Sequence, residues 1–454
     1  MKIVKFLLSL AAAGGLVYAL NTSLNVKGAP LPPLGKFLSP FHGFWQNADP
    51  ILPIHADLDF PELKNEVKIV YDDRDVPHVF AQNDSDAYFT QGYLHASNRL
   101  WQMDMAVRAS AGQLSEFLGN RPIRPGFSML DVDKLARRRG FLRAAEETVE
   151  VWKQDAEAFA MLESYCAGIN AFIKKQGERA LPFEYKFFGV TPSVWTPLKC
   201  AVFQKYMAKD LAFGNNDWQA TNSKTLLGQA DFDFLFPEYY KEQTPVVPAG
   251  TPFGFTAEKR QVSSAQNTPL SILSQKTPLD ALVDVPNIET ETASDPNNGS
   301  NNWVVAGSKT ANGKPILCGD PHLNLTLPAI WYEMQITTPD MNVYGASLPG
   351  TPCIFIGFND HIAWTVTNVG HDVADWYTIK WQDSTKNAYL LDGKYEKVQL
   401  RVEEITVKGV GIVRDTVRYT AWGPIVYPND TLPQHDMALH WLGNEKPAGG
   451  VGRL

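Results

Sequence analysis

The stretch "DPNNGSNNWVVAG", residues 295–307, passes within a few positions from a polar, turn-prone composition to a strand-like pattern. Gly299 and Ser300 lie at this junction, directly before the apolar run around Trp303. Residues 244–299, which lead up to it, are rich in Pro, Ser, Thr, Gln and Asn and show no sustained apolar periodicity. A segment of this kind within a compact protein is typical of a linker or of a functional loop.

The residues on the two sides of this segment follow different patterns. Apolar side chains recur every three or four positions in residues 84–118 and 137–175, which predicts helices. Residues 67–81 predict a strand, a turn and a second strand. After Ser300, short β-prone runs alternate with turn residues, and residues 308–313 fit the turn of a hairpin. The fold class is therefore α+β, with a helical part in front and a β-rich part behind.

The overall composition is that of a globular protein large enough for more than one domain: 454 residues, of which 44% are hydrophobic. The net charge is −8 and the sequence contains no basic run, which argues against a nucleic-acid-binding protein. The four cysteines are far apart and form no CxxC pair, so neither a zinc site nor a thioredoxin-like motif is expected. Buried thiols are the favoured interpretation, with one disulfide as the alternative if the chain is exported.

The N-terminus has the pattern of an export signal. Lys2 and Lys5 provide positive charge, residues 6–20 form an apolar run, and Val17–Ala19 resembles a signal-peptidase site. The run is short for a membrane-spanning helix, which needs about 20 residues. We therefore predict that residues 1–20 are a cleaved signal peptide and that the protein is periplasmic or exported, with an uncleaved membrane anchor as the alternative.

The chemistry at Ser300 does not follow a standard local motif, because GxSxG, HExxH, Walker A and EF-hand patterns are all absent. A serine hydroxyl is a weak nucleophile until a base lies beside it. If the chain is cut before Ser300, the new α-amino group, with a reference pKa of about 7.7–8.0, becomes that base. Gly299 has no side chain to shield its carbonyl, so the Ser300 hydroxyl could make the cut through an N-to-O acyl shift. The alternative is that Asn-Gly-Ser is a plain turn before a strand.

Five long blocks of the sequence occur in a specific order. "RDVPHVFAQNDSDAYFTQGYLHASNRLWQMD" and "RASAGQLSEFLG" precede the junction, and "GSNNWVVAG", "GKPILCGDPHLNLTLPAIWYEMQI" and "SLPGTPCIFIGFNDHIAWTVTN" follow it. Between about Val67 and Thr378 the chain resembles the penicillin acylase family of N-terminal-nucleophile hydrolases, which act on penicillins, cephalosporins or acyl-homoserine lactones. In this resemblance the first two blocks match the opening of the family's α chain. The third matches the start of its β chain, and the last matches its oxyanion strand.

The resemblance implies a four-layer αββα sandwich preceded by helical elements of the α chain. The implied function is hydrolysis of the amide bond of an N-acylated small molecule, such as a β-lactam or an acyl-homoserine lactone. The reaction would pass through an acyl-enzyme on Ser300, after autoproteolysis between Gly299 and Ser300. The implied domains are a signal peptide or membrane anchor (1–20), a helical α-chain portion (21–243), a spacer propeptide (244–299) and the start of the β chain (300–454).

The implied partners are the small-molecule substrate and the α and β chains of one precursor. No nucleic acid is expected, and a membrane is expected only through an N-terminal anchor. From the residues alone, two other functions stay open. One is an exported binding protein that is never cut, which electrophoresis would reveal as one band. The other is a conventional serine hydrolase with a Ser-His-Asp triad, in which a new N-terminal amine has no role.

The resemblance also assigns roles to individual residues. Ser300 matches the nucleophile and new N-terminus, and His322 matches a histidine that some members hold near it, where others have glutamine. The backbone N–H of Asn368 falls in the oxyanion hole. Leu323 and Ile356 fall on positions that line the acyl pocket. For His322, a purely structural role is the alternative.

Asp372 and Asp375 match carboxylates of the family's calcium site, and Ala374 would supply a carbonyl oxygen. Ca²⁺ takes several oxygen ligands, which suits this group. Asp217 is the nearest candidate for a further ligand from the N-terminal chain, with Gln219 as the alternative. The implied cofactor is a structural Ca²⁺, and no organic cofactor is expected. The alternative for each aspartate is a solvated loop carboxylate.

One feature of the family has no match in these residues. Its second oxyanion donor is an asparagine side chain that would lie beyond residue 454. Removing one oxyanion donor lowers turnover by about a hundred- to a thousandfold. We therefore expect a C-terminally truncated member whose segment 1–454 is nearly inactive by itself.

Overall fold

The computed structural model describes residues 2–26, 29–47, 57–177, 181–213, 217–237, 247, 250–252, 299–323, 325–368, 371–427 and 436–447. The chain forms two compact units, the larger made of Met1–Gly214 with Pro296–Leu454 and the smaller of Asn215–Asp295. Most of the predicted spacer, residues 244–299, lies outside the described residues. The predicted domain boundaries therefore stay predictions.

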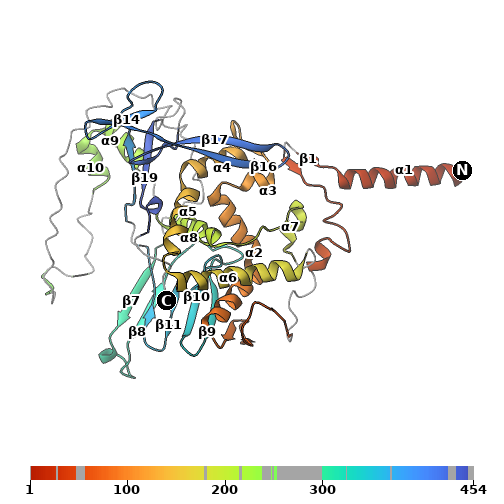
Figure 1. Cartoon of the computed structure of the whole chain (residues 1–454), viewed down its shortest axis with the longest axis horizontal. Coiled ribbons are helices and arrows are strands. Elements are labelled where there is room, and N and C mark those ends of the chain that lie inside the picture. The colour runs from red at the N-terminus through yellow and green to blue at the C-terminus, as the bar shows by residue number, and fades with distance from the viewer. Residues whose placement is uncertain are drawn as a thin grey trace. The chain divides into compact units, whose positions relative to one another are not determined.

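Helices make up most of the described N-terminal part (Figure 1). The longest begins after Asn83, whose side chain accepts a hydrogen bond from the backbone N–H of Asp86, and it ends at Gly112. Gly112 has a φ of 62°, a left-handed conformation that glycine adopts without strain. The helices are α1 (Lys2–Asn21), α2 (Asp84–Ala111), α3 (Leu114–Leu118), α4 (Met129–Arg138), α5 (Phe141–Trp152), α6 (Ala156–Gln176), α7 (Phe183–Phe188), α8 (Pro197–Ala212), α9 (Asp217–Leu227) and α10 (Gln229–Leu235).

Strands dominate the described residues after 299, as the sequence predicts. Short strands precede them in the N-terminal part: β1 (Leu24–Val26), β2 (Ala29–Leu31), β3 (Lys68–Tyr71), β4 (Pro77–Phe80), β5 (Pro122–Arg124) and β6 (Phe127–Ser128). The later strands are β7 (Asn301–Val305), β8 (Ile316–Asp320), β9 (Tyr332–Thr337), β10 (Asn342–Ser347), β11 (Ile356–Asn359), β12 (Ala363–Trp364), β13 (Ala374–Thr378), β14 (Ala388–Leu391), β15 (Lys394–Lys397), β16 (Gln399–Val407), β17 (Gly411–Thr420), β18 (Gly423–Pro424) and β19 (Met437–Trp441).

A six-stranded sheet joins the two halves of the larger unit, with the strand order β12-β11-β10-β9-β4-β3. Its pairs are antiparallel except for β4 and β9, which run parallel with Val79 opposite Ile336. Both of these side chains are buried, and they belong to a core that also contains Leu94 of α2. The predicted strands of residues 67–81 therefore lie in the same sheet as strands that follow Ser300.

Helices α2 and α6 cross in close contact. A Cβ atom at Gly92 would lie 2.0 Å from the backbone oxygen of Tyr165, and one at Gly168 would lie 1.8 Å from that of Phe89. Only glycine at these two positions lets the helix backbones approach so closely. The interface continues into the largest apolar core, which includes Leu100, Met103, Leu162, Ile169 and Phe172.

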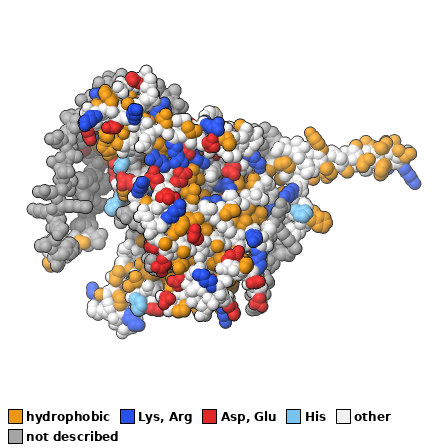
Figure 2. Space-filling view, in the orientation of Figure 1, with side chains coloured by type: hydrophobic (Ala, Val, Ile, Leu, Met, Phe, Trp, Pro, Cys, Tyr) orange, Lys and Arg blue, Asp and Glu red, His pale blue; other side chains and the backbone are white. Residues whose placement is uncertain are grey.

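Helix α1 stands apart from these cores because none of its residues is buried. Its surface is almost entirely apolar, with lysine at the end of the helix near residue 2 (Figure 2). Among the described helices, it is the one that is long and apolar enough to cross a membrane. This finding is compatible with the predicted signal sequence and equally with an anchor.

The four cysteines are free. Cys166 and Cys200 are buried, with their Sγ atoms 3.8 Å apart, whereas Cys318 and Cys353 are partly exposed. The prediction of buried thiols is therefore confirmed for the first two.

Candidate functional site

Ser300 lies directly before β7, at the open end of the β7–β8 hairpin. Asn301 is paired with Asp320 in this hairpin, so Ser300 lies next to the residues that follow β8. Its Oγ accepts a hydrogen bond from the backbone N–H of His322, with an N–O distance of 3.2 Å. The imidazole Nε2 of His322 lies 2.9 Å from Oδ2 of Asp320. The structure thus brings His322 to Ser300, through its backbone rather than through its ring.

The segment 365–368 lies against this hairpin. Gly319 approaches Thr365 so closely that an added Cβ atom would lie 1.9 Å from the threonine Oγ1. Asn302 Nδ2 donates a hydrogen bond of 2.8 Å to Oγ1 of Thr367. The predicted oxyanion residue Asn368 follows directly, so it shares one region with Ser300 and His322.

Asn368 also connects this region to the N-terminal part. Its side-chain Nδ2 donates a hydrogen bond to the backbone oxygen of Leu211, near the end of α8. The resemblance implied a role for the backbone N–H of Asn368, and the side chain adds a second role as a link to α8. The two partners are 157 positions apart, so no local pattern in the sequence could predict this contact.

Leu323 and Ile356, the predicted acyl-pocket residues, are both partly buried. Leu323 follows His322, and Ile356 begins β11 opposite Ala346. A hollow of about 640 Å³ lies near β11, with Tyr88, Met161, Phe355 and Trp364 among its lining residues. Its lining includes neighbours of Ile356 but not Ser300, Leu323 or Ile356 themselves. The acyl-pocket assignment stays a prediction.

The predicted calcium ligands occupy different surroundings. Asp372 and Asp375 are exposed, and Ala374 is buried at the start of β13, opposite Trp441. Asp217 begins α9 in the smaller unit, and Gln219 belongs to the same helix. No group of three or more His, Cys, Asp or Glu side chains that could hold a metal is assembled among the described residues. Two carboxylates and a carbonyl are the oxygen ligands that Ca²⁺ prefers, so the donor chemistry fits although the full set is not assembled.

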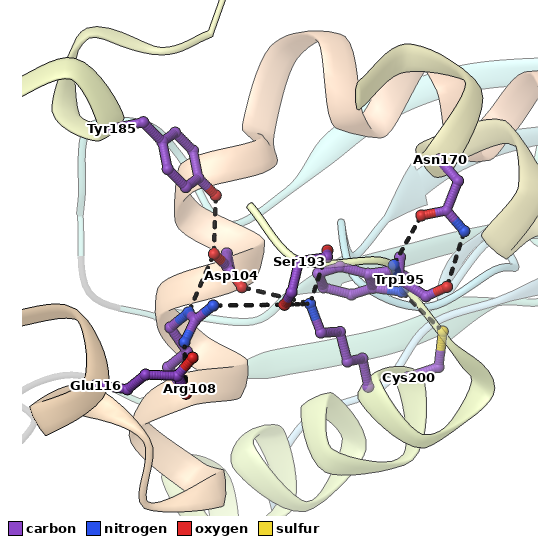
Figure 3. Close-up of polar contacts among 9 residues, drawn as sticks. Asp104, Arg108, Glu116, Asn170, Tyr185, Ser193, Trp195 and Cys200 are labelled. Carbon is purple, nitrogen blue, oxygen red and sulfur yellow. Dashed lines mark hydrogen bonds and ion pairs between the residues drawn. The ribbon is translucent and has the colours of Figure 1, made fainter. Parts of the chain in front are cut away.

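A buried polar network fixes the chain that leads into α8 (Figure 3). Oδ2 of Asp104 accepts hydrogen bonds from Arg108 Nε at 3.2 Å and from the Tyr185 hydroxyl at 3.0 Å. Lys199 Nζ lies 3.6 Å from the other carboxylate oxygen and donates to the backbone oxygen and hydroxyl of Ser193. Burial lowers the pKa of Lys199 and raises that of Tyr185.

Asn170 extends this network to Trp195. Its side chain accepts a hydrogen bond from the Trp195 N–H at 2.7 Å and donates one to the Trp195 backbone oxygen at 2.9 Å. The indole N–H in turn donates to the sulfur of Cys200, in the first turn of α8. The network therefore sets the position of α8, whose other end carries the Leu211 carbonyl that meets Asn368.

A second serine–histidine contact lies inside the protein. The Nε2 atom of His95 lies 2.9 Å from the Ser347 hydroxyl, and its Nδ1 atom lies 2.8 Å from the Tyr165 hydroxyl. His95 and Ser347 are both completely buried, so a substrate cannot reach them. Desolvation lowers the pKa of His95 to about 3, which keeps the ring neutral. His95 is therefore a packing residue whose polar contacts bridge α2, α6 and β10.

Comparison with known proteins identifies the family. The family model described as penicillin amidase matches residues 66–452, which is most of the chain. The chain belongs to the penicillin amidase family. The family resemblance seen in the sequence is therefore confirmed, and the described residues contain both helices and sheets, in agreement with the predicted α+β class.

Individual relatives are similar at a lower level. The chain is 28% identical to penicillin acylase 2 proenzyme of Pseudomonas sp. (strain SE83), over 82% of this chain and 45% of that protein. It is 27% identical to the acyl-homoserine lactone acylase QuiP of Pseudomonas syringae pv. tomato, over 86% of this chain and 44% of that protein. The chain thus spans about half the length of the curated relatives it matches.

Solved structures include one chain of a thermostable penicillin G acylase from Alcaligenes faecalis. It matches with a TM-score of 0.36 and 26% identity, over 40% of this chain and 97% of that one.

Proposed function

We propose that this protein hydrolyses the amide bond of N-acylated small molecules, with Ser300 as an N-terminal nucleophile that the chain exposes by cutting itself between Gly299 and Ser300. The observation that carries the proposal is the position of Ser300. It lies directly before the first strand of a hairpin, its hydroxyl accepts a hydrogen bond from the His322 N–H, and the Asn368 segment lies against the same hairpin. The curated relatives are named as acylases of penicillins and of acyl-homoserine lactones, which supports these two substrate classes.

Self-cleavage would begin with attack of the Ser300 Oγ on the carbonyl carbon of Gly299. The peptide C–N bond breaks, an ester forms on the serine oxygen, and the nitrogen becomes a free amine. Water then hydrolyses the ester, which leaves a carboxylate on Gly299 and restores the Ser300 hydroxyl. Gly299 is exposed, and a Cβ atom added there would have no neighbour within 4 Å, so its carbonyl lies in open surroundings.

Turnover would use the same hydroxyl on the substrate amide. The new α-amino group of Ser300, with a pKa of about 7.7–8.0 in a free chain, takes the hydroxyl proton and later returns it to the leaving amine. The resulting acyl-enzyme is hydrolysed by water. The backbone N–H of Asn368 would stabilise the oxyanion, and the hydrogen bond from its side chain to Leu211 would hold the segment 365–368 in place.

His322 would act as a positioning residue. Its N–H orients the Ser300 hydroxyl, while its pairing with Asp320 fixes the turn after β8. Leu323 and Ile356 would contact the acyl group. Export of the enzyme through residues 1–20 is part of the proposal, and the exposed apolar helix α1 supports it.

We also propose that Asp372 and Asp375 bind a structural Ca²⁺ with the Ala374 carbonyl and Asp217. Ca²⁺ would neutralise carboxylates of the two chains and so favour assembly. Replacing both aspartates with alanine should lower the yield of cut protein more than the turnover of enzyme that is already cut. An unchanged thermal stability of the calcium-stripped protein on addition of Ca²⁺ would contradict the site.

The test of the main proposal is Ser300→Ala in the full-length protein. The wild type should run as two fragments in denaturing electrophoresis and release phenylacetate or a fatty acid from N-acyl substrates. Ser300→Ala should remain one chain and release neither, whereas Ser308→Ala, an exposed serine in the following turn, should behave as the wild type. Normal cutting of Ser300→Ala would contradict the proposal. An uncut, inactive wild type would favour a binding protein, and an uncut, active one a conventional triad hydrolase.

A further inference from the structure

The β16–β17 hairpin extends from the part of the chain after Ser300 onto helices of the N-terminal part (Figure 1). Its two strands pair in regular antiparallel register from Gln399 opposite Tyr419 to Val407 opposite Gly411. Side chains of β16 alternate between two faces, as expected for a strand. Glu403, Ile405 and Val407 are buried against α3 and α4.

The buried face of the hairpin carries two acidic residues in an unfavourable arrangement. Glu403 and Asp415 are directly opposite each other in the register, and like charges in such a pair destabilise a sheet. Glu403 is only 2% exposed, so water cannot screen the repulsion. Arg401 of β16 itself supplies part of the positive charge that Glu403 needs, and the rest must come from outside the hairpin.

Helix α4 supplies that charge with two consecutive arginines. Arg137 Nη1 lies 2.8 Å from Glu403 Oε2, and both side chains are buried. Arg138 forms a two-bond contact with Asp415, at 2.7 and 2.8 Å. Planar guanidinium groups match carboxylates in this way, which makes the contact specific as well as strong.

Further contacts join the β16–β17 hairpin to the neighbouring helices. Arg401 donates to Glu403 and, through two bonds of 2.8 and 3.1 Å, to Glu146 of α5. Around the turn, the Lys408 N–H donates to the Ser115 backbone oxygen at 3.0 Å. Arg143 lies over the Tyr419 ring at 4.1 Å. Positive and negative side chains gather where the hairpin crosses the helices (Figure 2).

We propose that the β16–β17 hairpin is a docking arm that holds the N-terminal fragment on the C-terminal one after the chain is cut, with Glu403 as its central contact. The partner it fits is the α4–α5 surface of this same chain, which presents Arg137, Arg138 and Glu146. The proposal rests on the proposed function in one respect, namely that the chain is naturally cut between Gly299 and Ser300. Its test can therefore supply a cut by other means.

The experiment uses the full-length chain with Ser300→Ala, a site for a sequence-specific protease inserted within residues 253–298, and an affinity tag on the C-terminal part. After digestion the tagged fragment is held on resin and washed with increasing urea, and the N-terminal fragment that remains is quantified. Glu403→Gln should weaken retention at least about tenfold, because it removes the charged partner that Arg137 Nη1 contacts across the buried interface. Asp415→Asn should weaken retention less, since its pair is more exposed.

The matched control is Glu404→Gln. Glu404 is the next residue on β16, pairs with Arg414 of the same hairpin, and lies on the exposed face. It should release the fragment at the same urea concentration as the parent protein. Circular dichroism of the undigested variants checks that they fold. If Glu403→Gln does not fold, the retention measured for Asp415→Asn tests the proposal instead.

Equal retention for the parent, Glu403→Gln and Asp415→Asn would overturn the docking arm. Equal weakening by Glu404→Gln would overturn it as well, since the effect would then not be specific to the docked face. Failure of self-cleavage would appear separately, as an uncut wild-type chain.

Discussion

The network around Asp104 and the site around Ser300 each pair a carboxylate with a basic group, but they differ in burial. The side chains of Asp104 and Arg108 are 1% and 3% exposed, whereas those of Asp320 and His322 are 70% and 35% exposed. Removing one partner of a buried ion pair costs about 3–5 kcal/mol, while an exposed pair contributes about 0–1 kcal/mol. The Asp104 network next to α8 therefore contributes more to the free energy of unfolding than the Asp320–His322 pair. We expect changes to Asp320 and His322 to have little effect on folding.

The largest effect is expected for Asp104→Ala. It removes the buried carboxylate that contacts Arg108 and Lys199 and leaves Arg108 only its 3.5 Å contact with Glu116, so the free energy of unfolding should fall by about 3–5 kcal/mol. The exposed pair of Glu150 and Lys153 provides the control, and Glu150→Ala should change the free energy by less than about 1 kcal/mol. Urea unfolding measures both. If both variants lose less than about 1 kcal/mol of unfolding free energy, the Asp104 network does not stabilise the fold more than an exposed ion pair does.

His95 gives a pH-dependent effect of intermediate size. Its pKa is lowered to about 3 in the folded state, against about 6.5 in an unfolded chain. As the pH falls below 6.5, the unfolded chain binds a proton that the folded chain does not, so stability decreases. The slope approaches about 1.4 kcal/mol per pH unit.

Urea unfolding between about pH 6 and pH 5 checks this contribution, since His95→Gln should lack it. The exposed His361 is the control, and His361→Gln should keep the wild-type slope. Parallel slopes for wild type and His95→Gln would show that the buried ring is not the source.

The smallest effect on stability is expected for Asp320→Asn. The pair with His322 is exposed, so the free energy of unfolding should stay within about 1 kcal/mol of the wild type. Cleavage before Ser300 should nevertheless slow, because the turn that presents the His322 N–H loses its contact with the Asp320 carboxylate. A time course of fragment formation measures this. A large loss of unfolding free energy together with an unchanged cleavage rate would show that Asp320 stabilises the fold and does not assist cleavage.

The sequence predicts those features that depend on neighbouring residues. The helices within residues 84–118 and 137–175 follow from apolar periodicity, and the β7–β8 hairpin follows from the turn-prone residues 308–313. Features that depend on distant residues were not predictable. The parallel pairing of β4 with β9 and the contact of Glu403 with Arg137, 266 positions away, appear only when the chain is folded.

The same distinction applies to the crossing of α2 and α6 and to the candidate site. Glycine at 92 and 168 could signal a turn or a close helix crossing, and only the short approach to the facing backbone decides between them. The link from Asn368 to Leu211 has no local pattern. The predicted calcium set depends on Asp217, which belongs to the smaller unit, so residue types alone could not assemble it.

The most direct test of the central claim is the intact mass of the purified full-length protein, combined with N-terminal sequencing of each fragment. We expect two polypeptides, the second of which begins with Ser300, and a single polypeptide for Ser300→Ala. One uncut wild-type chain, or a second fragment that begins at a residue other than Ser300, would contradict it.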